Sequence, residues 1–222
     1  MNEINKLPLI AIILMAIFSL ASISGIGSDK VTASFAGITL IIGISIFFIT
    51  SSKEKDCGNK NQLDIKTFLK ALKDKQMSIL ILMPSIMNII CYLIAKLFVP
   101  EFVDHVAGRI DFLALDKFLL LIIQFMVAAL AEEIAWRAFF QKQLSKVITF
   151  VPALIISSVL FALCHYTQGN IIVVAYDILF VFVNAIFYGI IFYKTDNAFV
   201  SATAHFLANL LAATDLLKNV QL

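Results

Sequence analysis

The sequence has little charge for its length. Only 14% of its 222 residues are Asp, Glu, Lys or Arg, and 17 basic side chains against 15 acidic ones leave a net charge of +2. This balance offers no surplus of positive charge to a phosphate backbone, so we predict no nucleic-acid partner. The small charged fraction also leaves too few polar side chains to cover the surface of a soluble globule.

Cysteine is scarce too, and its positions argue against two kinds of site. Cys57, Cys91 and Cys164 are odd in number and lie at unrelated spacings, so they predict neither a disulfide framework nor a CxxC metal site. The sequence also lacks an HExxH metalloprotease motif, internal repeats and low-complexity linkers.

Apolar residues make up most of the rest of the sequence. Hydrophobic residues make up 61% of the chain and include 20 Phe, whereas a soluble domain has about 45–50%. In lipid every backbone amide needs an internal partner, which favours helices. We therefore predict an all-α, polytopic membrane helical bundle.

Apolar runs of about 20 residues predict about seven membrane-spanning helices. Two further segments are polar: residues 53–75 contain seven lysines, and residues 96–117 mix charges with apolar side chains, which predicts an interfacial helix. We predict one integral membrane domain with two parts, the N-terminal helices of residues 1–117 and a helical core over residues 118–222. The predicted spans are 7–28 and 31–52, paired as a hairpin, then 76–95, 118–141, 147–166, 171–193 and 198–214.

The lysines predict the orientation of the bundle. Lys6, the lysines of 53–75, Lys142, Lys146 and Lys194 all fall on one side if seven spans alternate. Basic residues of short loops concentrate in the cytoplasm, so we place the N-terminus and the 53–75 loop there, facing anionic lipid, and the C-terminus outside. The Phe- and Ile-rich composition and the lysine-rich loop favour a bacterial plasma membrane.

Ionisable side chains inside lipid cost about 2.5–3.5 kcal/mol each on insertion scales, so each needs a reason to be there. They concentrate in the last four predicted spans, whereas the first three spans carry only the amide of Asn88. The polar residues of the last four spans include Glu132, Glu133, Arg137, His165, Asp177, His205 and Asn209.

The run AEEIAWR places two neighbouring acids on one helix. Glu133 and Arg137 are four residues apart and predict an ion pair, whereas Glu132 is turned by about 100° and has no partner on this helix. A lone carboxyl in a low dielectric suits acid–base chemistry. A purely structural role for both acids, through partners on other helices, fits the spacing equally well.

Two histidines lie on other predicted spans. His205 and Asn209 share a helix face and suit either an oxyanion site or a contact between two helices. Phe161 shares a face with His165, so its ring can wall the pocket into which the imidazole points. Asp177 and Asn184 share a helix face and are expected to pair with the polar core, with contact to the site as an alternative for Asp177. Asp104 and His105 are interpreted as solvated residues of the interfacial segment.

Together these runs resemble a known family. EEIAWR fits the motif EExxxR, FALCH fits FxxxH and HFLAN fits HxxxN. In this order and at these separations they resemble the CPBP family of intramembrane proteases, also called the Abi or type II CAAX prenyl protease family, over about residues 118–212. The resemblance implies an α-helical membrane fold whose catalytic chamber opens toward the cytoplasm, with residues 118–222 as the catalytic core.

The resemblance also implies hydrolysis of a peptide bond in a membrane-associated peptide or protein. Glu132 would activate water, His165 would orient that water or Glu132, and His205 with Asn209 would stabilise the oxyanion. Supporting roles would fall to Glu133, Arg137 and Phe161. Cys164 neighbours His165 on the helix and points elsewhere, so we expect no Cys–His dyad.

The resemblance leaves three alternatives to weigh. The family is often described as metalloproteases, and zinc would take Glu132, His165 and His205 as ligands; a metal-free glutamate mechanism explains the same residues, and we favour it. A non-enzymatic immunity or scaffold protein would not need the complete motif set. A small proton-relaying transporter would need more intramembrane acids than Asp177 beyond that set.

Overall fold

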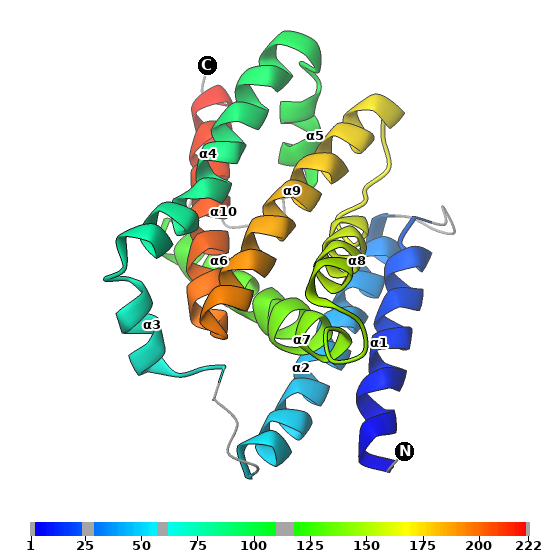
Figure 1. The fold of residues 1–222 in the computed structure, drawn as a ribbon. Coiled ribbons are helices and arrows are strands. Elements are labelled where there is room, and N and C mark those ends of the chain that lie inside the picture. Colours follow the sequence, from blue (N-terminus) through cyan, green and yellow to red (C-terminus); the bar gives the residue numbers. More distant parts are fainter. Residues whose placement is uncertain (1–2, 24–28, 57–61, 110–117, 221–222) are drawn as a thin grey trace.

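The computed structural model describes residues 3–23, 29–56, 62–109 and 118–220. The elements assigned in these ranges are all helical, which confirms the predicted all-α class (Figure 1). In chain order they are α1 (Glu3–Ala21), α2 (Asp29–Asp56), α3 (Ile65–Ala71), α4 (Lys75–Phe98), α5 (Phe102–Arg109), α6 (Phe118–Glu133), the π-helix η1 (Ile134–Gln141), α7 (Lys142–Leu144), α8 (Phe150–Leu163), α9 (Ile171–Thr195) and α10 (Ala198–Val220).

The helices carry the length and composition of a membrane protein. Four segments are long and apolar enough to cross a bilayer: Ala33–Ser52, Lys75–Phe98, Leu119–Leu144 and Ile171–Thr195. Large apolar side chains such as Leu97, Phe98 and Ile171 are each 76% exposed, as expected for a surface that faces lipid rather than water. The chain is an integral membrane protein. Shorter apolar helices cover Lys6–Ala21, Phe150–Leu163 and Ala198–Ala213, and the count of seven spans stays a prediction.

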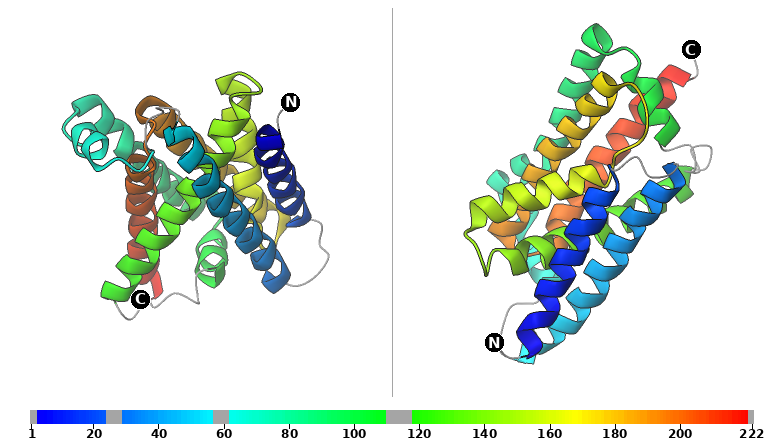
Figure 2. Two further views of the ribbon diagram at one scale, coloured as in Figure 1. Left: turned by 90° about the horizontal axis from the view of Figure 1, so that it is seen from below. Right: turned by 90° about the vertical axis from the view of Figure 1, so that its right-hand side faces the viewer.

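The π-helix η1 lies at the centre of the bundle. It contacts α2, α6, α8, α9 and α10, while α1 packs against α2 and α10 packs against α4 and α6 (Figure 2). All eight residues of η1 are buried. Two glycines allow this close packing: a Cβ on Gly43 of α2 would lie 2.6 Å from the Ala135 Cβ, and one on Gly189 of α9 would lie 2.5 Å from Gln141 Oε1.

The two ends of the bundle differ in the segments that they carry. The start of α1, α3 and α7 lie toward one end, and α5 and the end of α10 lie toward the other (Figure 1). Most lysine-bearing segments are therefore gathered at one end, as the alternation of spans predicts, whereas Lys96 in the last turn of α4 lies toward the other. Residues 57–61 of the lysine-rich loop, with Cys57, and residues 110–117 of the expected interfacial helix lie outside the described residues.

Polar contacts at the lysine-bearing end fix the turn between α9 and α10. Lys142 Nζ donates to Asp196 Oδ1 at 2.7 Å, and Asp196 caps α9 in the left-handed conformation at φ 48°. Asn197 Nδ2 donates to the Asp64 carbonyl, and the Ala198 N–H donates to the Gln62 carbonyl, both at 2.8 Å. These contacts set where α10 begins, and thereby set the height of His205 along the bundle.

Candidate active site

The two neighbouring acids stand where α6 gives way to η1. A uniform helix was expected over residues 118–141, but the structure places a π-helix after Glu133, in which each turn holds more residues than an α-turn. The expected ion pair is present, with Arg137 Nε 3.5 Å from Glu133 Oε2. The side chain of Glu133 is completely buried, whereas that of Glu132 is 20% exposed.

Arg137 and Gln141 tie η1 to α9. Arg137 Nη2 donates to the Ala185 carbonyl at 3.2 Å, and Gln141 Nε2 donates to the Gly189 carbonyl at 3.0 Å. The two donors are four residues apart on η1 and the two acceptors are four residues apart on α9, so the two helices stay in contact over about one turn. The helix that carries the acids is thereby held against the helix that walls the pocket described below.

His205 stands between the two acids. Its Nδ1 lies 3.1 Å from Glu133 Oε1, and its Nε2 lies 3.7 Å from Glu132 Oε2. The Tyr188 ring stacks on the imidazole at a centroid distance of 4.4 Å and an angle of 17°. Contacts to both nitrogens and to one ring face therefore hold His205 in place.

His165 approaches the same carboxylate from another helix. It follows the C-cap residue Cys164 of α8, and its Nδ1 lies 3.0 Å from the Phe161 carbonyl, an acceptor, so Nδ1 carries the proton. Its Nε2 lies 3.9 Å from Glu132 Oε2. The Sγ of Cys164 lies 3.2 Å from Ser19 Oγ, in agreement with the expectation that no Cys–His dyad forms.

Phe161 packs among the charged groups. Its buried ring lies 4.6 Å from the His165 ring centroid, and the Arg137 guanidinium carbon lies 4.4 Å from the centroid of the Phe161 ring. The ring therefore separates the Glu133–Arg137 pair from His165. The three motifs that the sequence singled out thus converge, although Glu132 and His205 are 73 residues apart in the chain.

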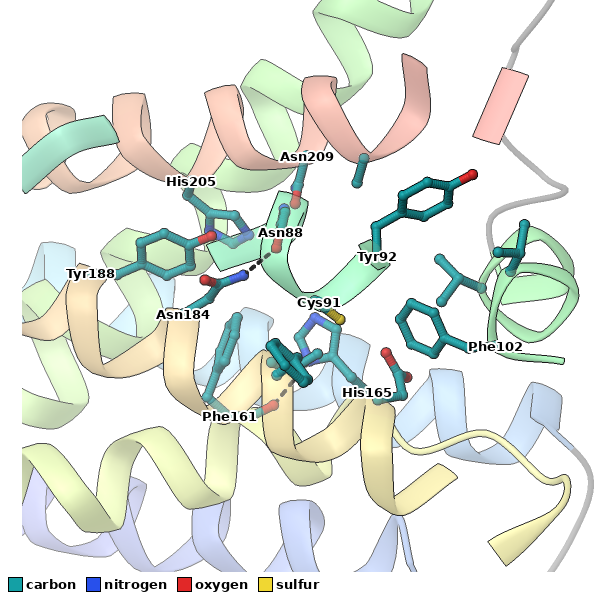
Figure 3. A pocket seen from close by; sticks show the side chains of 16 residues that line it. Asn88, Cys91, Tyr92, Phe102, Phe161, His165, Asn184, Tyr188, His205 and Asn209 are labelled. Carbon is teal, nitrogen blue, oxygen red and sulfur yellow. Dashed lines mark hydrogen bonds between the residues drawn. The ribbon is translucent and has the colours of Figure 1, made fainter. Parts of the chain in front are cut away.

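A pocket of about 130 Å³ leads away from His205 (Figure 3). Asn209 lines it beside His205, and His165 and Phe161 contribute to its wall. The pocket follows α9 from Tyr188 back to Asp177 and reaches α5 at its far side. It therefore extends away from the lysine-bearing end, whereas the family resemblance implied a chamber that opens on the lysine-bearing, cytoplasmic side.

The structure at the α5 side of the pocket contradicts the prediction that His105 is solvated. His105, expected to be solvated, has a side chain only 10% exposed and lies 3.7 Å from Asp177 Oδ2 through its Nε2. The same nitrogen lies 3.1 Å from Thr167 Oγ1. The physical reason is packing: α5 lies against α9, with the Phe102 ring edge-on to Tyr176 at 5.1 Å, so His105 turns away from solvent. Asp104 is exposed, as expected.

The metal alternative concerns Glu132, His165 and His205. Among the described residues, no group of three His, Cys, Asp or Glu side chains is arranged to hold a metal ion. Glu132, His165 and His205 converge, yet the atoms that face one another are the Nε2 atoms and a single carboxylate oxygen, at 3.7 and 3.9 Å. The zinc ligand set that the resemblance left open stays a prediction.

Residues 114–211 match the family model described as type II CAAX prenyl endopeptidase Rce1-like, a segment that includes all three motifs. Over this segment the chain is similar to the CAAX protease family. No curated protein and no solved structure matches the chain. Because the family is one of proteases, the match supports a peptidase activity on a membrane-associated substrate.

Some residues of the pocket had no predicted role. Tyr188 is one of many aromatic residues in an apolar run, and nothing in the sequence distinguishes it. Asn88 is the only amide in the interior of the first three predicted spans, since Gln76 stands at the edge of the third, and this signal could have placed it in the site. The structure instead reveals Asn88 through its contacts with Asn184 and α10.

Proposed function

We propose that this protein is an intramembrane endopeptidase that hydrolyses a peptide bond of a membrane-associated peptide or protein with a water molecule activated by Glu132. One observation carries the proposal. Glu132 Oε2 is buried without a hydrogen-bond partner among the described residues, and the Nε2 atoms of two histidines face it at 3.7 and 3.9 Å. Gaps of this size between polar atoms suit a water set beside them.

The chemistry needs no side-chain nucleophile. Glu132 takes a proton from the water while the water oxygen bonds to the scissile carbonyl carbon, which converts the carbonyl oxygen to an oxyanion. His165, whose Nδ1–H is bound to the Phe161 carbonyl, accepts the second water proton as a hydrogen bond through Nε2. Glu132 then gives its proton to the leaving nitrogen as the C–N bond breaks, which yields an amine and a carboxylic acid.

His205 and Asn209 stabilise the oxyanion in this proposal. His205 donates from Nδ1 to Glu133, so a second donation from Nε2 to the oxyanion requires the imidazolium form. With His205 and Arg137 positive and both glutamates negative, the four-residue cluster is neutral overall, which lowers the cost of its burial. Glu133 and Arg137 thus support the site from outside the pocket, and Phe161 supports it as part of the pocket wall.

We place the protein in a bacterial plasma membrane, with its N-terminus and residues 53–75 in the cytoplasm. The lysine-bearing end of the bundle supports this orientation. In it, the pocket extends from His205 toward the outer side of the membrane, where α5 lies. The substrate would then reach the site from that side.

Glu132→Gln tests the proposal, because glutamine is nearly isosteric with glutamate but cannot accept the water proton. The protein is reconstituted in lipid vesicles and given quenched fluorescent peptides ending in Cys-a-a-X, with and without a farnesyl group on the cysteine. We expect Glu132→Gln to lower kcat by at least about 100-fold, the lower end of the range for general acid–base catalysis. Glu101→Gln, an exposed substitution of the same kind, serves as the matched control.

Two outcomes would contradict the proposal. Cleavage by Glu132→Gln at the rate of the unmodified protein would exclude Glu132 as the base. Loss of activity on exhaustive chelation, with recovery on added zinc, would replace the metal-free mechanism by a metal-dependent one. A scaffold or immunity protein would cleave neither peptide, and its biological effect would survive the substitution.

A further inference from the structure

A chain of amides crosses the pocket wall from α10 to α9 through α4. Asn88 Nδ2 donates to the Ala208 carbonyl at 2.9 Å, and this contact fixes which end of the Asn88 amide is nitrogen. The Asn88 oxygen is therefore the acceptor on the other side, and Asn184 Nδ2 donates to it at 2.7 Å (Figure 3). The orientation of both amides follows from the one backbone carbonyl.

The chain ends in an acceptor without a donor. Asn184 Oδ1 is buried and has no hydrogen-bond partner within the described part of the structure, and the Asn184 residue is only 9% exposed. An unsatisfied buried polar atom costs about 1–3 kcal/mol. Both asparagines line the pocket that contains His205 and Asn209, so a molecule in the pocket can supply the missing donor.

The position of Asn184 relates it to the reacting groups. It lies four residues before Tyr188 on α9, which is one turn, or about 6 Å along the helix. Tyr188 stacks on His205, so Asn184 stands one turn from the proposed oxyanion site in the direction of α5. A distance of about 6 Å equals about two residues of extended peptide.

The chemistry of the free atom restricts what can bind it. A carbonyl oxygen accepts hydrogen bonds and cannot pair with phosphate or ester oxygens, which also only accept. The other side chains around Asn184 in the pocket include Phe180, Val181 and Tyr188, which give it an aromatic and apolar surround. An extended peptide offers backbone N–H donors at regular intervals, which matches a single acceptor in such a surround.

We propose that Asn184 Oδ1 accepts a hydrogen bond from a backbone N–H of the substrate, about two residues from the scissile bond, and so aligns that bond with Glu132 and His205. Asn88 is a positioning residue that holds the Asn184 amide in this orientation. The inference rests on the proposed function and adds a substrate-binding residue outside the three motifs.

The test replaces single backbone amides of the cleavable peptide by esters, which removes one N–H at a time. In the unmodified protein, one ester within three residues of the scissile bond should lower kcat/KM by about three- to tenfold, the equivalent of one hydrogen bond. In Asn184→Leu that ester should change kcat/KM by less than twofold. Asn88→Leu tests the positioning role: it keeps the Asn184 acceptor but removes the contact that orients it, so its ester penalty should lie between those of the unmodified protein and Asn184→Leu.

Folding is checked by the melting temperature of each variant in vesicles, and Asn184→Ala replaces Asn184→Leu if the latter does not fold. An equal ester penalty in the unmodified protein and in the Asn184 variant would overturn the inference. The absence of any ester penalty in the unmodified protein would also overturn it, because the oxygen would then hold only water.

A binding measurement separates this inference from the proposed function. Fluorescence anisotropy compares the amide and ester peptides on Glu132→Gln, and on Glu132→Gln combined with Asn184→Leu. If the unmodified protein fails to cleave but Glu132→Gln binds the amide peptide more tightly than the ester, and only while Asn184 is present, the proposed function fails and the inference holds. If Glu132→Gln binds neither peptide, the inference is wrong.

Discussion

Arg137 neutralises a carboxylate that no water reaches, and its removal should be among the most destabilising single changes in the protein. The side chains of Arg137 and Glu133 are 1% and 0% exposed, and their nearest charged atoms are 3.5 Å apart. Arg137→Met keeps an unbranched side chain that can pack on the Phe161 ring. It removes one of the two cationic groups beside Glu133 and leaves His205, and breaking a buried pair in this way costs about 3–5 kcal/mol.

The double variant Glu133→Gln/Arg137→Met should recover part of that loss. With both charges gone, the remaining cost is mainly the hydrogen bond from Arg137 to the Ala185 carbonyl, about 1.5–3 kcal/mol for a charged donor. We therefore expect a coupling of at least about 2 kcal/mol between the two single substitutions. Lys142→Met is the control, since it breaks a partly exposed ion pair with Asp196 and should cost at most about 1 kcal/mol.

The assay is the free energy of unfolding in mixed micelles, followed by the fluorescence of Trp136. This residue is the only tryptophan of the chain, is buried in η1 and lies next to Arg137. If the costs of Glu133→Gln and Arg137→Met simply add in the double variant, the two charges do not compensate each other and the reasoning is refuted.

Two further predictions concern the frame of the site. Gly43→Ala should destabilise the protein by about 1–3 kcal/mol, because its Cβ would lie 2.6 Å from the Ala135 Cβ, whereas Gly37→Ala meets no described atom within 4 Å and should be neutral by the same measurement. At the start of α3, hydrogen bonds from the Thr67 side chain and backbone N–H lower the pKa of Asp64 below its usual 3.8. The Asp64 cap should therefore stabilise α3 fully above that value and weaken as the pH falls through the lower folded pKa, so amide exchange of α3 should rise there in the unmodified protein but not in Asp64→Asn.

Local spacing predicted the parts of the site that lie within one helix. Residues four apart share a face, so the Glu133–Arg137 pair and the common face of Phe161 and His165 followed from the sequence and recur in the structure. The same rule could not show that His205 lies between Glu132 and Glu133, because that contact joins α10 to the junction of α6 and η1. No residue type in AEEIAWRAFF predicts a π-helix either.

The prediction that His105 is solvated was wrong for a related reason. A charged and apolar segment beside a membrane span is typical of an interfacial helix, and the sequence contains no sign that α5 packs on α9. Once it does, His105 meets Asp177 and Thr167, and Phe102 reaches the pocket. Contacts between residues 62 to 74 apart in the chain depend on how helices pack, which the periodicity of either segment leaves open.

The sequence by itself determined that this chain is an all-helical membrane protein with motifs that resemble those of the CAAX protease family. Its hydrophobic composition requires lipid around it, and residues four apart in a helix share a face. Only the tertiary structure decided that Glu132 meets two histidines, that the pocket extends toward α5, and that Asn184 keeps a free acceptor. Those features depend on the depth and rotation of separate helices, which Gly43, Gly189 and the η1–α9 contacts set at close range.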